Sequence, residues 1–379
     1  MRRVLSLFVC CATPLAVCAA HDTGSYLRLK QVQIIDPGMD KVQAALPAFD
    51  LLVPSAWNFK GNVVFGGGKS GCLADLFAVS WDAASVDGSI AFQGAPDYSW
   101  QYADDPAVLK KLTDPNRRAL GTDAKPCPVM KPMKAEEYLR QYVLKALPNG
   151  STVVSVEPFP ELNAIARKQM GLPPGDGGGN GSGAQTDAVR MRAEFQKDGK
   201  AQEGWLAVAV VTRIYHQGRG SFYDSHAVDL TALRAPRGQL DANDKLFKVM
   251  LSAMRPEPKW RSYSTGIIGK LYNAQARKEA AQDQIIAELQ RYAAQTIMDV
   301  TANQFRGSMN SAYAADQNIR GVQTFRDPST GRTMELSNLY DHAWLNGANE
   351  YLMSADPNFN PNGNLSGNWT SLQPVRPDP

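Results

Sequence analysis

A glycine-rich stretch, FGGGKSGC at 65–72, has the residue types of a phosphate-binding loop. In such a loop a glycine stands five positions before the glycine of Gly-Lys-Ser/Thr, so that backbone N–H groups point at the phosphates. Here the position five before Gly68 is Val63, and the residues that follow Lys69 and Ser70 have a strand composition where the motif needs a helix. The sequence therefore predicts a glycine-rich turn between two strands rather than a nucleotide site.

The histidines form no recognised catalytic motif. Neither HExxH nor GxSxG occurs, which leaves out the helix of zinc hydrolases and the nucleophile elbow. The stretch YDSH at 223–226 gathers Asp224, Ser225 and His226 in one predicted strand, where adjacent side chains point to opposite faces. These three residues therefore cannot form a triad with one another, and no catalytic residue is predicted. The four histidines are His21, His216, His226 and His342.

Side-chain oxygens are dense in DPNFNPN at 356–362, and oxygen is the ligand that calcium prefers. No acidic residue lies between Pro357 and Pro361, so a turn built of Asn and Pro explains the stretch better than a calcium loop. We predict no metal site and no cofactor.

Three aromatic residues near the C-terminus, Trp344, Tyr351 and Trp369, stand among Asn and Ser. They are candidates for stacking a sugar ring, as on a cell-wall carbohydrate. The competing interpretation is that they form the core of a small sheet, which needs large side chains to bury enough area.

The N-terminus predicts an exported protein. Residues 1–20 carry two arginines, an apolar run and a small-residue end, which is the pattern of a cleaved signal peptide. Lipidation at Cys18 is the competing interpretation. No later segment is long and apolar enough to span a membrane. We expect a periplasmic or secreted protein without a transmembrane anchor after cleavage.

Cysteine usage agrees with that location. Three of the five cysteines lie within residues 1–20, which leaves Cys72 and Cys127. A single pair in an oxidising compartment predicts one disulfide. It would close a loop of about 55 residues and contribute roughly 4 kcal/mol in the chain-entropy model.

The charge balance excludes one class of partner. Without Arg2 and Arg3, the 40 Lys and Arg residues become 38, against 37 Asp and Glu. A near-neutral surface gives no reason to expect nucleic acid as a partner. An envelope protein or a cell-wall component is the expected partner.

Hydrophobic patterns predict an α+β fold, an antiparallel sheet covered by helices, in a domain spanning 21–262. Short alternating runs from Phe49 onward are typical of strands, and the Asp-Gly pair in 85–88 predicts a hairpin turn. Amphipathic helices are predicted at 134–148 and 239–260, and a shorter helix at 161–170. Residues 173–187 predict a flexible glycine-rich loop, followed by a long hairpin around KDGK.

Several of these features together resemble the PsbP-like α/β sandwich over about residues 45–260. The similar stretches are LLVPSAW, SVDGSIAF and DKLFKVMLSAMRPEPKW. Members of that fold generally serve as binding or assembly factors, so the resemblance implies a non-catalytic role. This chain departs from the pattern in the glycine loop and after residue 262.

A long helix is predicted from about Ile267 to Phe305, within a region 263–310, because the stretch from Leu271 to Phe305 has no internal Pro or Gly. Its apolar stripe, which includes Leu289, predicts packing on its own domain, and a homodimer contact is the alternative. We expect the second half, 285–300, to lie between the main domain and the tail. The tail at 320–373 predicts a small antiparallel β-module.

The sequence thus favours a non-catalytic binding, assembly or scaffold protein of the bacterial cell envelope. A hydrolase, or a protein that binds cell-wall carbohydrate through the C-terminal aromatic residues, is the alternative. A histidine within hydrogen-bond reach of a serine, cysteine or carboxylate in a cleft would favour the hydrolase.

Overall fold

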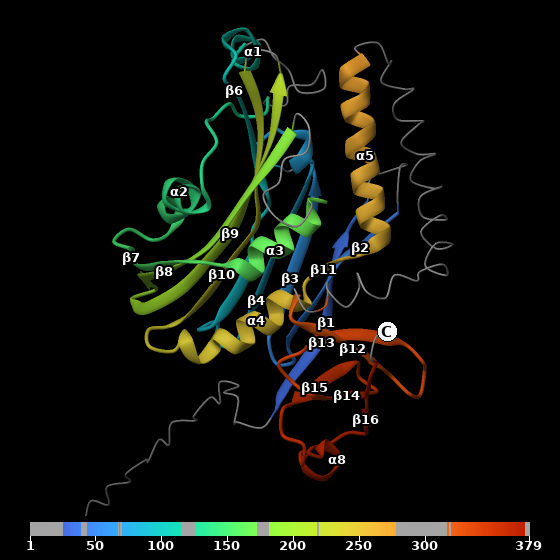
Figure 1. Cartoon of the computed structure of the whole chain (residues 1–379). Coiled ribbons are helices and arrows are strands. Elements are labelled where there is room, and N and C mark those ends of the chain that lie inside the picture. The colour runs from blue at the N-terminus through green and yellow to red at the C-terminus, as the bar shows by residue number, and fades with distance from the viewer. Residues whose placement is uncertain are drawn as a thin grey trace, which may run out of the picture.

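The structure is a computed structural model that describes residues 26–38, 44–66, 68, 70–114, 126–172, 182–217, 220–277, 317 and 320–375. Within them the chain folds into antiparallel sheets with helices packed on them, an α+β fold as predicted (Figure 1). No helix among these residues is both long enough and apolar enough to pass through a bilayer.

The largest element is a curved eight-stranded sheet. Seven of its strands follow one another across it, and β6 (Tyr98–Ala103) pairs with β10 beyond the end of β5. The seven, in order, are β3 (Asn58–Phe65), β4 (Phe77–Ala84), β5 (Ala91–Gly94), β10 (Gly220–Pro236), β9 (Lys200–Gln217), β8 (Ser182–Lys197) and β7 (Thr152–Pro158).

The predicted turns of this sheet are confirmed. Asp198 and Gly199 both have positive φ, as the two-residue turn of a β-hairpin requires, and they join β8 to β9. Gly88, also at positive φ, lies in the turn between β4 and β5. The glycine-rich stretch at 65–72 belongs to the connection between the antiparallel strands β3 and β4, as expected.

Both faces of the large sheet are covered, which explains why β9 reads as an almost continuous apolar run. Alternate residues of β9 enter two different cores, and both sets are buried. One core contains helices α3, α4 and α5, and the other contains α2 (Figure 1). The residues of the first set are Trp205, Ala207, Ala209 and Val211, and those of the second are Leu206, Val208 and Val210.

Helical segments lie close to the predicted positions, with one boundary corrected. The helix predicted at 239–260 ends at Ala253, because Arg255 and Pro256 pair with strand β2 and the chain turns into a new helix at Pro258. The segments are η1 (Leu73–Asp75), α1 (Pro106–Leu112), α2 (Ala135–Tyr138), η2 (Leu139–Val143), η3 (Leu144–Ala146), α3 (Pro160–Gln169), η4 (Asp241–Asn243), α4 (Asp244–Ala253), α5 (Pro258–Arg277) and α8 (Pro361–Asn364).

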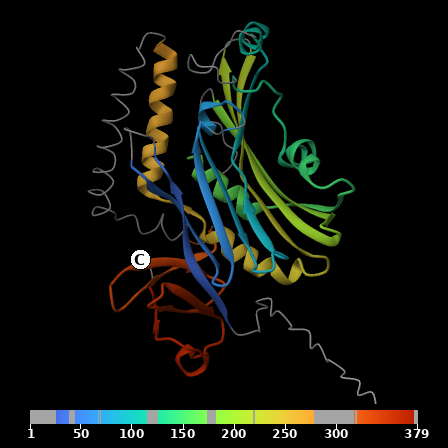
Figure 2. The ribbon, with the colours of Figure 1, turned by 180° about the vertical axis from the view of Figure 1, so that it is seen from behind.

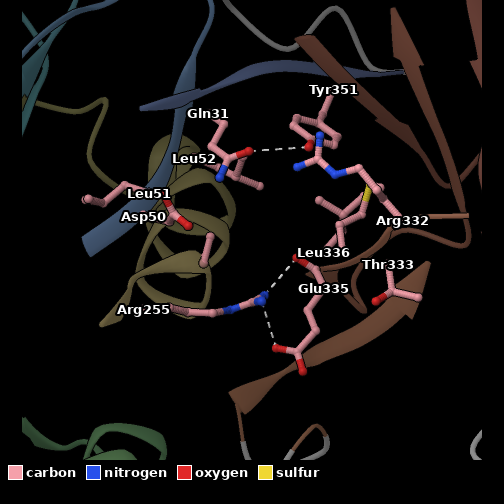
Figure 3. Close-up of a pocket in the computed structure, with 12 residues that line it drawn as sticks. Gln31, Asp50, Leu51, Leu52, Arg255, Arg332, Thr333, Glu335, Leu336 and Tyr351 are labelled. Carbon is pink, nitrogen blue, oxygen red and sulfur yellow. Dashed lines mark hydrogen bonds and ion pairs between the residues drawn. The ribbon is translucent and has the colours of Figure 1, made fainter. Parts of the chain in front are cut away.

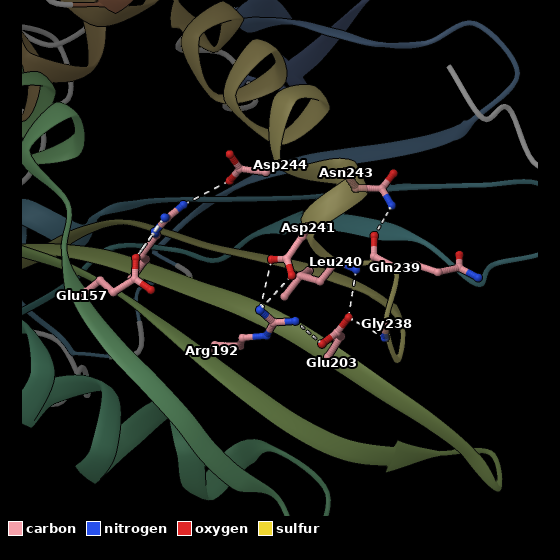
Figure 4. A network of polar contacts seen from close by, with 10 residues as sticks. Glu157, Arg192, Glu203, Gly238, Gln239, Leu240, Asp241, Asn243 and Asp244 are labelled. Atoms are coloured by element: carbon pink, nitrogen blue, oxygen red, sulfur yellow. Dashed lines mark hydrogen bonds and ion pairs between the residues drawn. The ribbon is translucent and has the colours of Figure 1, made fainter. Parts of the chain in front are cut away.

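A buried carboxylate supports the turn that leads into α4 (Figure 4). Glu203 of β9 accepts hydrogen bonds from the backbone N–H groups of Gly238 (2.7 Å) and Leu240 (2.9 Å). It also pairs with Arg192 at 2.6 Å, and Arg192 reaches Asp241 at 3.0 Å. The start of α4 is therefore fixed to the sheet.

A second, six-stranded sheet joins the two ends of the chain. β1 pairs with β2 on one side and with β15 on the other, so the C-terminal strands continue a sheet that begins near residue 27 (Figure 2). The order is β11 (Arg255–Pro256), β2 (Leu46–Pro54), β1 (Leu27–Asp36), β15 (Glu350–Ser354), β14 (His342–Asn346) and β16 (Trp369–Ser371).

The expected C-terminal module at 320–373 therefore has the predicted short strands but shares its sheet and core with the N-terminal strands. A third sheet, β13 (Thr333–Ser337), β12 (Val322–Arg326) and β17 (Gln373–Pro374), completes it. Leu29 of β1 and Val249 of α4 belong to the same core as Phe325 and Met353. Strands this short bury too little area alone, which is why they complete a core with other elements.

The glycine-rich loop is shorter than predicted. Residues 182–187, assigned to the loop at 173–187, lie in β8 and pair with β9. The Thr186 hydroxyl accepts a hydrogen bond from Arg167 of α3 at 2.8 Å, and Asp187 accepts one from the Ala135 N–H at 2.9 Å. These polar residues form a strand because β9 supplies their backbone hydrogen-bond partners. Residues 173–181 lie outside the described residues.

Two other predictions fall largely outside the described residues. The signal segment at 1–20 does so entirely. The predicted long helix is described only as α5, which begins at Pro258 and is followed to Arg277. Leu289 and the stripe at 285–300 lie beyond it.

Candidate functional site

A cleft of about 690 Å³ lies between α5 and the end of the large sheet formed by β6, β9 and β10. Figure 1 shows α5 standing alongside these strands on the face that carries α3. Thr265, Ile268 and Tyr272 of α5 form one wall. The volume falls in the range of small-molecule sites, about 300–1,000 Å³. We take this cleft as the candidate functional site.

The imidazole of His226 lies at the floor of the cleft between a hydroxyl and a carboxylate. Its Nδ1 is 2.8 Å from Ser99 Oγ, and its Nε2 is 3.1 Å from Asp224 Oδ2. Asp224 and His226 are two residues apart on β10 and share a face, while Ser99 comes from the paired strand β6. The order carboxylate, imidazole, hydroxyl is that of a hydrolase triad.

Asp75 extends this network on the other side of Ser99. Its carboxylate accepts hydrogen bonds from Ser99 Oγ at 2.6 Å, from the Ser99 N–H at 2.7 Å and from the Ser70 hydroxyl. Burial raises the pKa of Asp75, and the hydrogen bonds from Ser70 and Ser99 only partly offset that effect. The chain of contacts therefore runs from Asp75 through Ser99 and His226 to Asp224.

The glycine-rich stretch positions Asp75. A Cβ on Gly68 would lie 2.2 Å from the backbone oxygen of Asp75, so only glycine allows the loop to fold over η1. Gly66 and Gly71 have positive φ, which glycine adopts at no steric cost. The stretch that resembles a phosphate loop is thus the turn that brings Ser70 and Asp75 beneath β6.

The disulfide predicted between Cys72 and Cys127 is present, with Cα atoms 4.2 Å apart. It ties the loop that carries Asp75 to the segment beside β6, where the Pro128 carbonyl accepts a hydrogen bond from the Gln101 N–H at 2.9 Å. Ser70 Oγ also accepts from the Cys72 N–H at 3.0 Å. The bridge therefore fixes one half of the polar network.

The network is closed to direct attack on a substrate. Ser99 is 1% exposed and His226 6% exposed. Both ring nitrogens of His226 face an oxygen, and Ser99 Oγ has one proton to share between Asp75 and His226. A nucleophile needs an open approach, and a general base needs a nitrogen that can reach the substrate's proton. In this arrangement the four residues form a rigid polar floor.

Aromatic rings surround the open part of the cleft. Tyr215 and Phe222 face each other across β9 and β10 with centroids 6.1 Å apart, and Tyr272 stands on the opposite wall. Burial, together with nearby Asp224, raises the pKa of Tyr272 to about 12, so its phenol stays protonated at neutral pH. Arg213 and Gln101 add polar groups to the lining. Such a surface suits a ligand with flat apolar faces and polar edges.

The sequence singled out Asp224 and His226 without predicting a contact between them, and it missed Ser99 and Asp75. Ser225 points away from His226 and lies 3.0 Å from Thr212 on the other face, as strand alternation predicts. The condition set for the hydrolase, a histidine near a serine and a carboxylate in a cleft, is met by His226. No motif in the sequence marks Ser99 or Asp75 as part of a site. Ser99 comes close to His226 only because strands that are 127 positions apart in the chain pair with each other.

The three C-terminal aromatic residues do not form one platform. Tyr351 points into the shared core, with its hydroxyl 3.4 Å from Gln31 Oε1 at the edge of a cavity of about 210 Å³ (Figure 3). Trp344 and Trp369 lie on the other face of the sheet, where Arg28 stacks over Trp369 at 5.6 Å and Phe359 packs on Trp344 at 5.7 Å. Tyr351 and Trp369 are buried, which agrees with the core interpretation, and Trp344 is half-buried.

The oxygen-rich stretch at 356–362 is a capped turn. Asp356 Oδ1 accepts from the Asn358 N–H at 2.9 Å, and Asn360 caps α8 through the Asn362 N–H at 3.1 Å. Within the described residues no group of three or more His, Cys, Asp or Glu side chains is arranged to hold a metal ion.

Comparison with known proteins names no family. No protein-family model matches the chain, and no curated protein matches it. Among solved structures, a crystal structure from Bacteroides thetaiotaomicron VPI-5482 at 1.50 Å resolution is similar at 11% identity and a TM-score of 0.18, over 76% of this chain and 85% of that one. A TM-score this low supports no inference about function, which must rest on the residues and contacts described above.

Proposed function

We propose that this protein is an exported, non-catalytic binding or assembly protein of the cell envelope, and that its ligand occupies the cleft between α5 and the large sheet. The observation that carries the proposal is the cleft itself: aromatic rings line it, and the polar groups at its floor are already paired with one another. Such a site can hold a ligand, while Ser99, His226 and Asp224 at its floor are engaged with one another.

Export is supported by the signal-like segment at 1–20 and by the disulfide between Cys72 and Cys127, since disulfides persist in oxidising compartments. The resemblance of residues 45–260 to PsbP-like domains, which generally bind or assemble, points to the same role. An envelope protein or a cell-wall carbohydrate fits an aromatic cleft with polar edges, because rings stack on flat apolar faces.

A matched pair of tyrosine variants tests the proposal. Tyr272 in the cleft is 40% exposed and Tyr142, on the opposite side of the sheet, is 39% exposed. Wild-type protein and both alanine variants are incubated with solubilised envelope and with soluble cell-wall fragments, and captured components are identified by mass spectrometry. We expect Tyr272→Ala to lose a component that the wild type and Tyr142→Ala retain. Capture that is identical for all three proteins would place the binding surface elsewhere.

A hydrolase is the second candidate, because Asp224, His226 and Ser99 stand in the order of a catalytic triad. This function needs the Ser99 hydroxyl to become accessible when the substrate binds. A fluorophosphonate probe and an activated ester measure that directly. Covalent labelling or ester hydrolysis that disappears in Ser99→Ala but persists in Ser225→Ala would establish the hydrolase and overturn the non-catalytic proposal.

A further inference from the structure

The cavity of about 210 Å³ shown in Figure 3 lies where the six-stranded sheet faces β13 and α4. Gln31 of β1, Leu52 of β2 and Tyr351 of β15 line it from the six-stranded sheet. Gln31 lies opposite Leu52, and Leu29, two residues from Gln31, lies opposite Tyr351, so these side chains share one face. The described residues that line this cavity are all different from those that line the α5 cleft.

Arg332 supplies a cation at one side of the cavity. It directly precedes β13 and is exposed, and no described residue forms a hydrogen bond or an ion pair with its guanidinium. Asp327, an acid of the same turn, accepts hydrogen bonds from the hydroxyls of Ser329 and Thr330, each at 2.7 Å. Burial raises the pKa of Tyr351, and Arg332 acts against that shift, so the guanidinium lies within electrostatic reach of the phenol. Arg332 can therefore receive an anion at the cavity.

Two carboxyl groups lie on the other side. Asp50 of β2 lines the cavity, and Figure 3 shows it across the cavity from Arg332. Its carboxylate accepts a hydrogen bond from the Gln33 amide at 2.9 Å and shares another with Glu257. The contact with Asp50, together with burial, raises the pKa of Glu257 to about 7, while Lys259 acts in the opposite direction. The two groups together still carry at least one negative charge at neutral pH, which suits an ammonium group.

The lining between these two sides is polar and apolar in turn. The Tyr351 hydroxyl is 3.4 Å from Gln31 Oε1, longer than the usual hydrogen bond between oxygens, so both groups can bond a ligand. Arg255 and Glu335 form an ion pair with each other at 2.9 Å along one wall. The apolar side chains of the lining include Leu52, Met334 and Leu336.

The spacing of the two charged sides sets the length of a ligand that reaches both. The residues of β1 opposite Tyr351 and Asp50 are Leu29 and Gln33, four positions apart, which corresponds to about 13 Å along the strand. An α-amino acid carries its ammonium and carboxylate on the same carbon atom and is too short. An extended peptide spans about 3.3–3.6 Å per residue, so a chain of about three residues matches.

We propose that this cavity binds a short free peptide, with its N-terminal ammonium group beside Asp50 and its C-terminal carboxylate on the guanidinium of Arg332. A guanidinium binds a carboxylate through two parallel hydrogen bonds, which fixes the direction of the peptide. An apolar side chain in the middle of the peptide lies against Leu52 and Leu336, which removes its surface from water. The site is separate from the α5 cleft and from the function proposed for it.

The tripeptide Ala-Leu-Ala is the probe, and isothermal titration calorimetry measures its binding to the purified full chain. Two derivatives each lack one charge: the N-acetylated tripeptide has no ammonium group, and the tripeptide amide has no carboxylate. We expect each derivative to bind at least about tenfold more weakly than the probe, because each leaves one charged side of the cavity without its partner. Free leucine, which cannot reach both sides, should bind more weakly by a similar factor.

Arg332→Gln tests the carboxylate end of the peptide. We expect it to bind the probe at least about tenfold more weakly and to bind the probe and its amide alike. Arg326→Gln is the matched control, because Arg326 is also exposed and lies on the neighbouring strand β12, next to Phe325, which faces the core. The control should bind all ligands like the wild type.

Asp50→Asn/Glu257→Gln tests the ammonium end. It should lose a similar factor for the probe and bind the probe and its N-acetylated form alike. The matched control is Asp82→Asn/Glu137→Gln, since each of these carboxylates, like Asp50, accepts a hydrogen bond from a glutamine amide, away from the cavity. The series of derivatives tests the same end on the wild type, so the result does not depend on the stability of the double variant.

Four results would overturn the site. They are no detectable binding of the probe at millimolar concentration, equal affinity for the N-acetylated tripeptide, equal affinity for the amide, or unchanged binding in the two charge variants.

Discussion

The pKa values of two buried carboxylates, Asp75 of η1 and Glu203 of β9, are shifted in opposite directions. Asp75 is 3% exposed and Glu203 is 2% exposed, and each accepts three hydrogen bonds or ion-pair contacts. The donors of Asp75 are neutral hydroxyl and amide groups. Glu203 has the guanidinium of Arg192 at 2.6 Å in addition to two amides (Figure 4).

The pKa values diverge accordingly. Burial raises the pKa of Asp75, and its neutral donors do not reverse the shift. Burial acts upward on Glu203 as well, but Arg192 and the backbone amides outweigh it, and the pKa of Glu203 lies below its usual value. The guanidinium of Arg192 favours the ionised form of Glu203, whereas the loss of water is the largest influence on Asp75. Glu203 holds a turn, whereas Asp75 supports the floor of a cleft.

The largest expected effect follows from removing the anion that Arg192 needs. Glu203→Ala leaves two backbone amides without their acceptor and leaves the partly buried guanidinium of Arg192 with only the exposed Asp241 as an ion-pair partner. It should reduce the free energy of unfolding by about 3–5 kcal/mol. Equilibrium urea unfolding measures this change. Glu194→Ala is the control, because its carboxylate pairs with Arg237 at the surface and should cost under about 1 kcal/mol. Equal losses in both variants would contradict the assignment.

Removing the disulfide tests how far it stabilises the loop that carries Asp75. Cys72→Ser/Cys127→Ser releases the loop that carries Asp75 and should reduce the free energy of unfolding by about 2–4 kcal/mol. The same urea titration measures it, and a thiol assay on the denatured, unreduced wild type should find neither Cys72 nor Cys127 free. Two reactive thiols would show that the bridge does not form.

Asp229 extends the comparison to a carboxylate with even fewer donors. Its Oδ2 is buried without a hydrogen-bond partner in the described part of the chain, and burial raises its pKa to about 6. A raised pKa means that stability present below the unfolded-state value near 3.8 is lost as the pH rises through about 6.

Asp229→Asn should therefore stabilise the protein at pH 7.5 by about 1–2 kcal/mol, less than the roughly 3 kcal/mol that the shift alone implies, because the side chain is only partly excluded from water. Asn also tolerates the positive φ of 54° at this position. Thermal unfolding at pH 4 and pH 7.5 checks the result, and an equal gain at both pH values would show that the charge is not its cause.

The smallest expected effect is a difference in how the stability of two variants, relative to the wild type, changes with pH. For Glu203, whose pKa is lowered, stability is present above the unfolded-state pKa and lost on acidification, so the disadvantage of Glu203→Gln should grow as the pH rises from 3 to 7. For Asp75, whose pKa is raised, stability is lost as the pH rises, so Asp75→Asn should gain on the wild type over the same range. Parallel slopes in urea titrations of the two variants would remove the distinction between the two carboxylates.

The sequence predicted local structure correctly wherever residues close together in the chain determine it. The turn at Asp198-Gly199, the cysteine pair, the helix at 161–170 and the short antiparallel strands of the tail all depend on short-range geometry or on simple counting. The structure contains each of them. Strand alternation also separated Ser225 from His226 correctly.

Long-range pairing lay beyond the sequence. The tail seemed a separate module because nothing in residues 320–373 reveals that β15 pairs with β1, more than 300 positions away along the chain. The predicted loop at 173–187 was too long for a similar reason, because the polar residues 182–187 form a strand only by pairing with β9.

The sequence by itself determined the strand and helix composition, the disulfide and the absence of a recognised catalytic motif, because periodicity, turn residues and cysteine number are local properties. Only the tertiary structure decided that Ser99 and Asp75 meet His226, and that Asp50 and Arg332 line one cavity. The physical reason is that a side chain's charge state and partners depend on burial and on residues brought close by strand pairing and helix packing, which no single stretch of sequence contains.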